Sequence, residues 1–306
     1  MEISIACTDG RELAGQLFPV PDGAQRRGTV VIASATAVRA GYYRRYAEYL
    51  AENGFTAVTF DYRGIGGSRG GSLRGQRVRW YEWGSLDIDA VLAWALAQAD
   101  GLPVHFVGHS FGGYGVGLAA HASGLGRILT VGAQHAYWRD LRLRHQLGHW
   151  GRALLMFPLV GIFGYFPAKR LGLMEDLPAG VALDWARSRK DFTTAAAGAV
   201  RSTLRAHQAA VAAPLLALAP TDDAYATVAA MERAVAYTPH SPARIFQLHP
   251  SAYGRASLGH FALFHSRYRD SFWPQTLAWL RDGSWEWGDS AGRPSVELGD
   301  DDIPRR

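Results

Sequence analysis

Alternating and continuous apolar runs divide most of the chain into predicted strands and helices. Residues 2–6 and 12–18 alternate in polarity on either side of Thr8-Asp9-Gly10, which predicts an antiparallel hairpin. The remaining predicted elements are strands at 29–32, 55–60, 103–107, 127–131, 214–218 and 243–248, and helices at 42–53, 86–99, after Ser110 and after His260. This alternation favours an α/β fold with a mostly parallel central sheet flanked by helices.

The strand–helix alternation stops at Gly132 and resumes at Pro214. The residues between are rich in Trp, Phe and Leu, are helically patterned, and are too many for a plain loop. We therefore expect a core of residues 1–132 and 214–283, an inserted helical lid at 133–213, and a polar, loosely held tail at 284–306. The longest apolar stretch, 153–166, is too short to span a membrane, and we interpret it as internal packing or an apolar lid surface.

Composition places the chain among globular proteins. It has 306 residues, of which 48% are hydrophobic and 19% charged, enough for a full core in one domain with an insertion. The N-terminus lacks the basic start and apolar centre of a signal peptide, and Cys7 is the only cysteine. We expect a reducing, cytoplasmic setting and no membrane span.

The formal net charge of +5 comes almost entirely from arginines scattered along the chain. No basic run is interleaved with stacking aromatics, so we expect no nucleic-acid partner. One local cluster contains Arg139, Arg142, Arg144 and Arg152. It indicates either a site for an anionic substrate or, more commonly, a solvated helix face. The sequence leaves the oligomeric state open, a homodimer included.

The most specific chemical signal is Gly108-His109-Ser110-Phe111-Gly112, which lies between a predicted strand and a helical stretch. This pattern predicts a nucleophile elbow, a sharp turn that exposes the Ser110 hydroxyl above the sheet. The flanking glycines let strand and helix pass close to the turn. His109 would point elsewhere, into packing or a supporting hydrogen bond.

A serine nucleophile needs a histidine base and an orienting carboxylate, which follow it in the order acid, then histidine. Asp222 and Asp223 lie just past the strand that resumes after the insertion. We prefer Asp223 because it lies four residues before Thr227, a suitable helix N-cap, and we keep Asp222 as the alternative acid or a turn-stabilising residue. His260 follows the last strand and is the predicted base, with His265 as its nearest rival.

Stabilising an oxyanion requires two N–H donors. The first expected donor is Phe111, which follows the serine, and the second is Thr36 in the loop after strand 29–32. If that loop were a simple connection, the site would have one donor.

These features together resemble the α/β-hydrolase fold superfamily over most of residues 28–280. Four segments are similar to a group of bacterial serine α/β hydrolases of undefined substrate: Tyr42-Tyr43-Arg44-Arg45-Tyr46-Ala47, Asp61-Tyr62-Arg63-Gly64-Ile65-Gly66, Glu175-Asp176-Leu177-Pro178 and Gly259-His260-Phe261. The resemblance implies a Ser-His-Asp mechanism carried by Ser110, His260 and Asp223 or Asp222. Ser34-Ala35 departs from the His-Gly common in the oxyanion loop.

We therefore expect a serine hydrolase, of the carboxylesterase or thioesterase type, that cleaves a small-molecule acyl substrate through an acyl-enzyme. Transfer of the acyl group to another acceptor, carbon–carbon bond hydrolysis, and ligand binding without turnover remain alternatives. No cofactor is expected, and no metal, because His145 and His149 lack a matching carboxylate. Aromatic residues of the expected lid suggest an apolar acyl or aromatic substrate, with candidate binding residues Trp138, Trp150, Phe157, Phe163 and Trp185.

Overall fold

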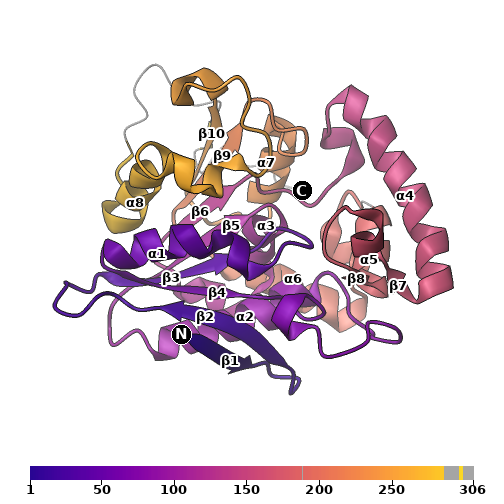
Figure 1. The fold of residues 1–306 in the computed structure, drawn as a ribbon, viewed down its shortest axis with the longest axis horizontal. Coiled ribbons are helices and arrows are strands. Elements are labelled where there is room, and N and C mark those ends of the chain that lie inside the picture. Colours follow the sequence, from indigo (N-terminus) through magenta and orange to yellow (C-terminus); the bar gives the residue numbers. More distant parts are fainter. Residues whose placement is uncertain (188, 286–295, 299–306) are drawn as a thin grey trace.

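A nine-stranded sheet forms the centre of the part of the chain that the computed structural model describes, residues 1–285 except 188, together with 296–298. Its order is β1-β2-β4-β3-β5-β6-β9-β10-β11 (Figure 1). The strands are β1 (Glu2–Ala6), β2 (Glu12–Phe18), β3 (Gly28–Ala33), β4 (Phe55–Phe60), β5 (Val104–His109), β6 (Ile128–Val131), β9 (Leu215–Pro220), β10 (Ala243–Leu248) and β11 (Val296–Leu298). Those from β4 to β10 along the sheet pair in parallel, whereas β1, β2 and β11 pair antiparallel.

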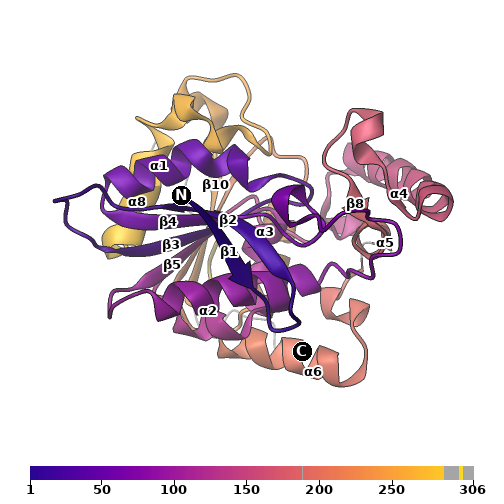
Figure 2. The ribbon, with the colours of Figure 1, turned by 60° about the horizontal axis from the view of Figure 1, so that its bottom comes forward.

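Helices cover both faces of the sheet, as the continuous apolar strands require. On one face, α1 (Arg44–Glu52) and α8 (Phe272–Asp282) pack through side chains such as Tyr46 and Trp273. On the other lie α2 (Asp89–Ala97), α3 (Phe111–Gly115) and α7 (Val228–Val235). Figure 2 shows α1 and α2 on opposite sides of the strands. The mostly parallel sheet flanked by helices confirms the predicted fold class.

Strands β4 and β10 have the predicted bounds, whereas the region after Ser110 differs from the predicted continuous helix. There α3 has five residues and is followed by short 3-10 turns at Val116–Leu118 and Ala120–Gly124. Four glycines between 112 and 117 explain the difference, because glycine disfavours a continuous helix. Gly112 and Gly113 are nevertheless required for packing, since a Cβ on either would lie under 3.0 Å from the neighbouring backbone or side chain.

Residues 133–213, expected from the sequence to form an insertion, lie between β6 and β9. They contain α4 (Leu143–Phe163), β7 (Tyr165–Phe166), β8 (Leu177–Pro178), α5 (Ala179–Arg187) and α6 (Gly198–Ala210). Helix α4 packs on α5 and β7 at the outer edge of the molecule, while α6 packs beneath the core on the turns after α3 (Figures 1 and 2). Ion pairs tie the insertion to the core, among them Arg79–Asp184 at 2.7 Å and Arg69–Asp176 at 3.1 Å.

Two further sequence expectations concern the chain end and membranes. Most of the expected tail, 284–306, lies outside the described residues, and its described strand β11 pairs with β10. In the described part of the chain, no helix combines the length and apolarity needed to cross a membrane.

Candidate active site

Ser110 lies at the turn between β5 and α3 in a backbone conformation that L-residues rarely adopt, with φ 54° and ψ −120°. Its N–H donates to Val131 O at 2.9 Å, which fixes the turn against the end of β6. A Cβ on Gly108 would lie 2.4 Å from Gly113 Cα, and one on Gly112 would lie 2.4 Å from Ala33 O. The two glycines are thus required by close contacts, and the strained turn has the geometry of a nucleophile elbow.

His260 and Asp223 form a buried pair in two loops at the same edge of the sheet. Asp223 follows β9, is 1% exposed, and its Oδ2 accepts from His260 Nδ1 at 2.7 Å. Asp223 Oδ1 accepts from the N–H groups of Tyr225 and Ala226 at 2.8 and 3.1 Å. The carboxylate therefore holds both the imidazole and the turn that leads into α7, where Thr227 is the N-cap.

Asp222, the alternative acid, has a different set of partners. Its carboxylate accepts from Ser257 Oγ at 2.6 Å, Leu258 N at 3.0 Å and Gly259 N at 3.1 Å. It thus anchors the loop that precedes His260 and makes no hydrogen bond to the imidazole. Sequence reasoning assigned Asp222 a local turn as its structural role, but the turn-forming contact belongs to Asp223.

The electrostatic setting keeps both carboxylates ionised. Burial raises the pKa of Asp223, but the charge of His260 and hydrogen bonds from His260, Ala226 and Tyr225 outweigh it, so the net pKa lies below the usual value. Burial likewise raises the pKa of Asp222, and the bonds from Ser257, Gly259 and Leu258 bring it below its usual range. A charged Asp223 can therefore orient His260 through Nδ1 and stabilise its protonated form.

Two residues at the end of β6 contact this site and were missed by the sequence analysis. Gln134 Nε2 donates to Ser110 Oγ at 3.2 Å, while its Oε1 accepts from Ala136 N. Gly132 has φ +61°, and a Cβ there would lie 3.0 Å from His260 Cε1. Gly132 therefore lies next to the His260–Asp223 pair, and the preceding residue, Val131, binds the N–H of Ser110. Only their position after β6 could have indicated Gln134 and Gly132 in the sequence, because β6 pairs with β5 and parallel strands end at the same edge of the sheet.

His109 connects three parts of the site through a chain of hydrogen bonds. Tyr43 Oη accepts from Ala35 N at 2.9 Å and lies 2.7 Å from His109 Nδ1, while His109 Nε2 lies 2.9 Å from the His260 carbonyl oxygen. Because that carbonyl can only accept, Nε2 carries the proton and Nδ1 accepts from Tyr43. Burial and the nearby His260 lower the pKa of His109 to about 3, which favours the required neutral form.

The two expected oxyanion donors are Thr36, in the loop after β3, and Phe111, at the start of α3. Both lie close to the hydrogen bonds made by Tyr43 and His109. Ala37 has φ 60°, and the Ser34 carbonyl accepts from Tyr62 Oη at 3.1 Å, so contacts at both ends shape the loop 34–37. Within the described residues, neither Thr36 N–H nor Phe111 N–H donates to another protein group. Both donors thus remain available for a ligand oxygen.

The five aromatic residues suggested for substrate binding do not form one cluster. Trp138 packs on Trp150 at 5.4 Å, and Phe163 packs on Tyr165 at 6.3 Å. Trp150 and Phe157 are 45% and 43% exposed on the outside of α4. Trp185 alone among the five reaches the elbow region through a described ring contact, because it packs on Trp80 at 6.2 Å.

A different aromatic group surrounds the elbow. Trp80 stacks on Phe111 at 4.9 Å, and Phe192 contacts Trp80 and Tyr114 at 5.3 and 4.8 Å. Tyr225 packs on the His260 ring at 5.2 Å, and Arg152 of α4 donates to Tyr225 Oη at 3.0 Å. Side chains of the insertion thus reach both sides of the site.

The remaining candidates make no described contact with Ser110 or with the His260 ring. His265 is exposed and packs on Tyr42 at 5.5 Å. Of the Arg cluster, Arg142 donates to Thr221 O and Arg139 lies over Trp138. Among the described residues, no group of three or more His, Cys, Asp or Glu side chains is arranged to hold a metal ion.

Comparisons with known proteins agree with this architecture. Residues 24–133 match the family model described as serine aminopeptidase, S33. No curated protein matches the chain. A soluble variant of monoglyceride lipase from Saccharomyces cerevisiae superimposes with a TM-score of 0.63 at 15% identity, covering 94% of this chain and 97% of that one.

Two further solved structures are similar over nearly the whole chain. Paleococcus ferrophilus monoacylglycerol lipase has a TM-score of 0.55 at 15% identity, covering 89% of this chain and 99% of that one. The Pyrococcus furiosus esterase Pf2001 has a TM-score of 0.55 at 13% identity, covering 93% and 92%. From its sheet order, its elbow and these similarities, the chain has the α/β-hydrolase fold.

Proposed function

We propose that the protein is a serine hydrolase that cleaves an ester or thioester with a largely apolar acyl or aromatic group. The observation that carries the proposal is the 2.7 Å hydrogen bond between Asp223 and His260, at the sheet edge where the elbow presents Ser110. Fold alone does not imply function, but an oriented base beside a strained serine is the arrangement that acyl transfer needs.

In the proposed mechanism, His260 Nε2 takes the proton of Ser110 Oγ as that oxygen attacks the substrate carbonyl. Gln134 donates to Oγ, so the serine's own proton is free to leave toward the base. The N–H groups of Phe111 and Thr36 stabilise the oxyanion. His260 then protonates the leaving group, and an activated water cleaves the acyl-enzyme and restores Ser110.

The preference for apolar substrates rests on the rings beside the elbow. Trp80, Phe111 and Phe192 are buried rings that pack on one another beside the proposed nucleophile, so the surroundings of Ser110 are apolar. Trp185 from the insertion packs on the same group, and Arg152 reaches Tyr225, which packs on His260. We therefore assign residues 133–213 the role of a lid. The lipase and esterase neighbours support carboxylic esters as the first substrates to test.

The test combines labelling with turnover. A fluorophosphonate probe should modify Ser110, and Ser110→Ala should abolish both labelling and hydrolysis of p-nitrophenyl esters of graded acyl length. His260→Ala should lower kcat by several orders of magnitude, whereas the matched variant His265→Ala should retain activity. Unlabelled Ser110 in folded protein, or tight ester binding without turnover, would overturn the proposal.

A further inference from the structure

The outer face of α4 is apolar and exposed to solvent. It consists of residues spaced by three and four along the helix: Leu143, Leu147, Trp150, Leu154 and Phe157. Leu143 and Leu147 are each 80% exposed and Leu154 is 71% exposed, and Ile162 nearby is 65% exposed. This spacing places the five side chains in one stripe. A contiguous apolar patch of this kind marks an interaction surface on a globular protein.

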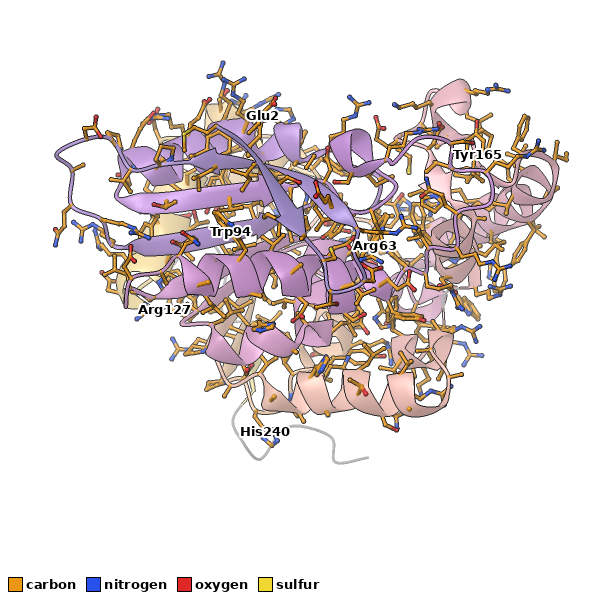
Figure 3. The ribbon with its side chains drawn as sticks, turned by 90° about the horizontal axis from the view of Figure 1, so that it is seen from below. Glu2, Arg63, Trp94, Arg127, Tyr165 and His240 are labelled. Atoms are coloured by element: carbon orange, nitrogen blue, oxygen red, sulfur yellow. The ribbon has the colours of Figure 1, made fainter. Side chains whose placement is uncertain are left out.

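The opposite face of α4 is the one that packs on the rest of the protein, and it is also largely apolar. His149, Ala153, Met156 and Val160 are buried against α5 and its neighbours. A helix that is apolar on both sides has one face in the protein and needs a cover for the other. Figure 3 shows the side chains around the insertion that carries Tyr165 extending away from the sheet into solvent.

The surroundings of the outer face carry positive charge. Residues 141–174 contain three arginines in α4 and its N-cap, then Lys169 and Arg170, and no Asp or Glu, although Lys169 pairs with Glu175 at 2.9 Å. Other arginines join the rim through direct contacts: Arg187 lies over the Phe157 ring at 5.9 Å, and Arg74 donates to Ile162 O at 3.3 Å. Among the described residues, Arg74, Arg139, Arg144 and Arg170 are exposed and form no ion pair.

We propose that the outer face of α4 docks on the surface of a lipid bilayer that contains anionic lipids. The apolar side chains would enter the boundary between headgroups and acyl chains, and the surrounding arginines would contact anionic headgroups. A second copy of the chain is the poorer occupant, because symmetric pairing of α4 would bring together two sets of exposed arginines that form no ion pair among the described residues. Docking places the helix in the plane of the membrane surface and requires no spanning segment.

The inner face of the same helix reaches the candidate active site. Arg152 of α4 contacts Tyr225, which packs on His260. A docked α4 would therefore hold the site next to the lipid surface, where apolar esters concentrate. The docking itself does not depend on the proposed chemistry, and the Ser110→Ala variant should bind vesicles as the unchanged protein does.

The experiment is co-sedimentation of the full chain with vesicles of phosphatidylcholine alone or with a third phosphatidylglycerol. We expect binding to the anionic vesicles at least ten-fold tighter than to the neutral ones, and weaker binding at high salt. The variant Leu143→Ser/Leu147→Ser/Leu154→Ser should lose at least ten-fold in affinity, and Arg139→Gln/Arg144→Gln/Arg170→Gln should lose the preference for anionic vesicles.

A matched control is Val200→Ser, because Val200 is 45% exposed on α6, away from α4. It should bind as the unchanged protein does. Circular dichroism should show that the triple leucine variant is folded. Absence of vesicle binding, or equal binding by that variant, would overturn the proposal. A dimer in solution that the leucine variant dissociates, without vesicle binding, would overturn it in favour of a second copy.

Discussion

The side chains around Ser110 and those on the outer face of α4 differ in their partners. Around Ser110, buried polar groups bond to one another: Tyr43 to His109, His109 to the His260 carbonyl, and His260 to Asp223. On α4, large apolar groups face water, and four exposed arginines beside them, Arg74, Arg139, Arg144 and Arg170, form no ion pair among the described residues. The hydrogen bonds that hold His260 are all made within the chain, whereas we propose that the outer face of α4 is covered by an external surface. The proposed hydrolysis depends on hydrogen bonds fixed within the chain, while the proposed docking on a bilayer depends on side chains that the fold leaves exposed.

The largest expected effect is acid unfolding of the buried histidines. Burial lowers the pKa of His109 to about 3 and those of His105, His135 and His149 to about 4. An unfolded histidine titrates near 6.5, so below that pH the unfolded chain binds more protons and stability falls as pH falls from about 6.5 toward 4. Each of these histidines should lower the free energy of unfolding by about 3 kcal/mol at pH 4. The four together are comparable with the stability of a whole domain.

Urea midpoints measured between pH 7 and pH 4 check this prediction. The arginines around α4 keep their charge over this range. Replacing the exposed His265 with Asn should leave the profile unchanged. A midpoint that does not move with pH would show that these histidines are not held neutral.

The next effect separates the two adjacent aspartates. Asp223→Asn should lower kcat for ester hydrolysis by about 10⁴-fold, because the amide no longer stabilises protonated His260. Asp222→Asn should lower it only about ten-fold, because it loosens the loop at residues 257–259 without touching the imidazole. Steady-state kinetics on both variants distinguish them, and equal losses would contradict the assignment.

A smaller effect tests the hydrogen-bond chain through His109. Tyr43→Phe leaves Ala35 N and His109 Nδ1 without their partner, so we expect about 1–3 kcal/mol less stability. It should also lower kcat about ten-fold with little change in KM, since the oxyanion loop and the His260 loop lose their link. Tyr46→Phe is the matched control, because its hydroxyl bonds Thr276 on α8, away from the site, at 2.8 Å. It should lose stability and keep kcat; a similar kcat loss in both variants would assign Tyr43 a merely structural role.

The smallest effect concerns α4 in solution. Leu154→Ala should change the free energy of unfolding by no more than about 0.5 kcal/mol, because this side chain is 71% exposed. Met156→Ala, two residues further and 2% exposed, should cost about 2–5 kcal/mol through the cavity it leaves. Chemical denaturation measures both, and a large loss for Leu154 would show that the outer face is covered within the chain.

Local patterns in the sequence predicted most of the strands and helices of the central sheet and its flanking layers. The bounds of β4 and β10 could be read from continuous apolar runs, and Thr227 was recognisable as an N-cap from its type and place. The relation of Ser110 to Asp223 and His260 followed from chain order. Each of these features depends on a short segment and on the way parallel strands end at one edge.

The supporting contacts could not be predicted, because they join segments far apart in sequence. Tyr43 and His109 are 66 residues apart, and nothing local distinguishes Tyr43 from Tyr42 or Tyr46. The role of Asp222 depends on residues 35 to 37 positions later. The apolar pattern of α4 likewise does not tell which face is buried, since both faces carry large side chains.

The loop carrying His260 is held at three points: Asp222 at its approach, Asp223 at the ring, and His109 at the carbonyl. An imidazole restrained in backbone and ring has little rotational freedom left to lose when a substrate arrives. In the proposed mechanism, the conformational entropy of placing this base is therefore lost during folding, and each turnover would begin with the base already in position.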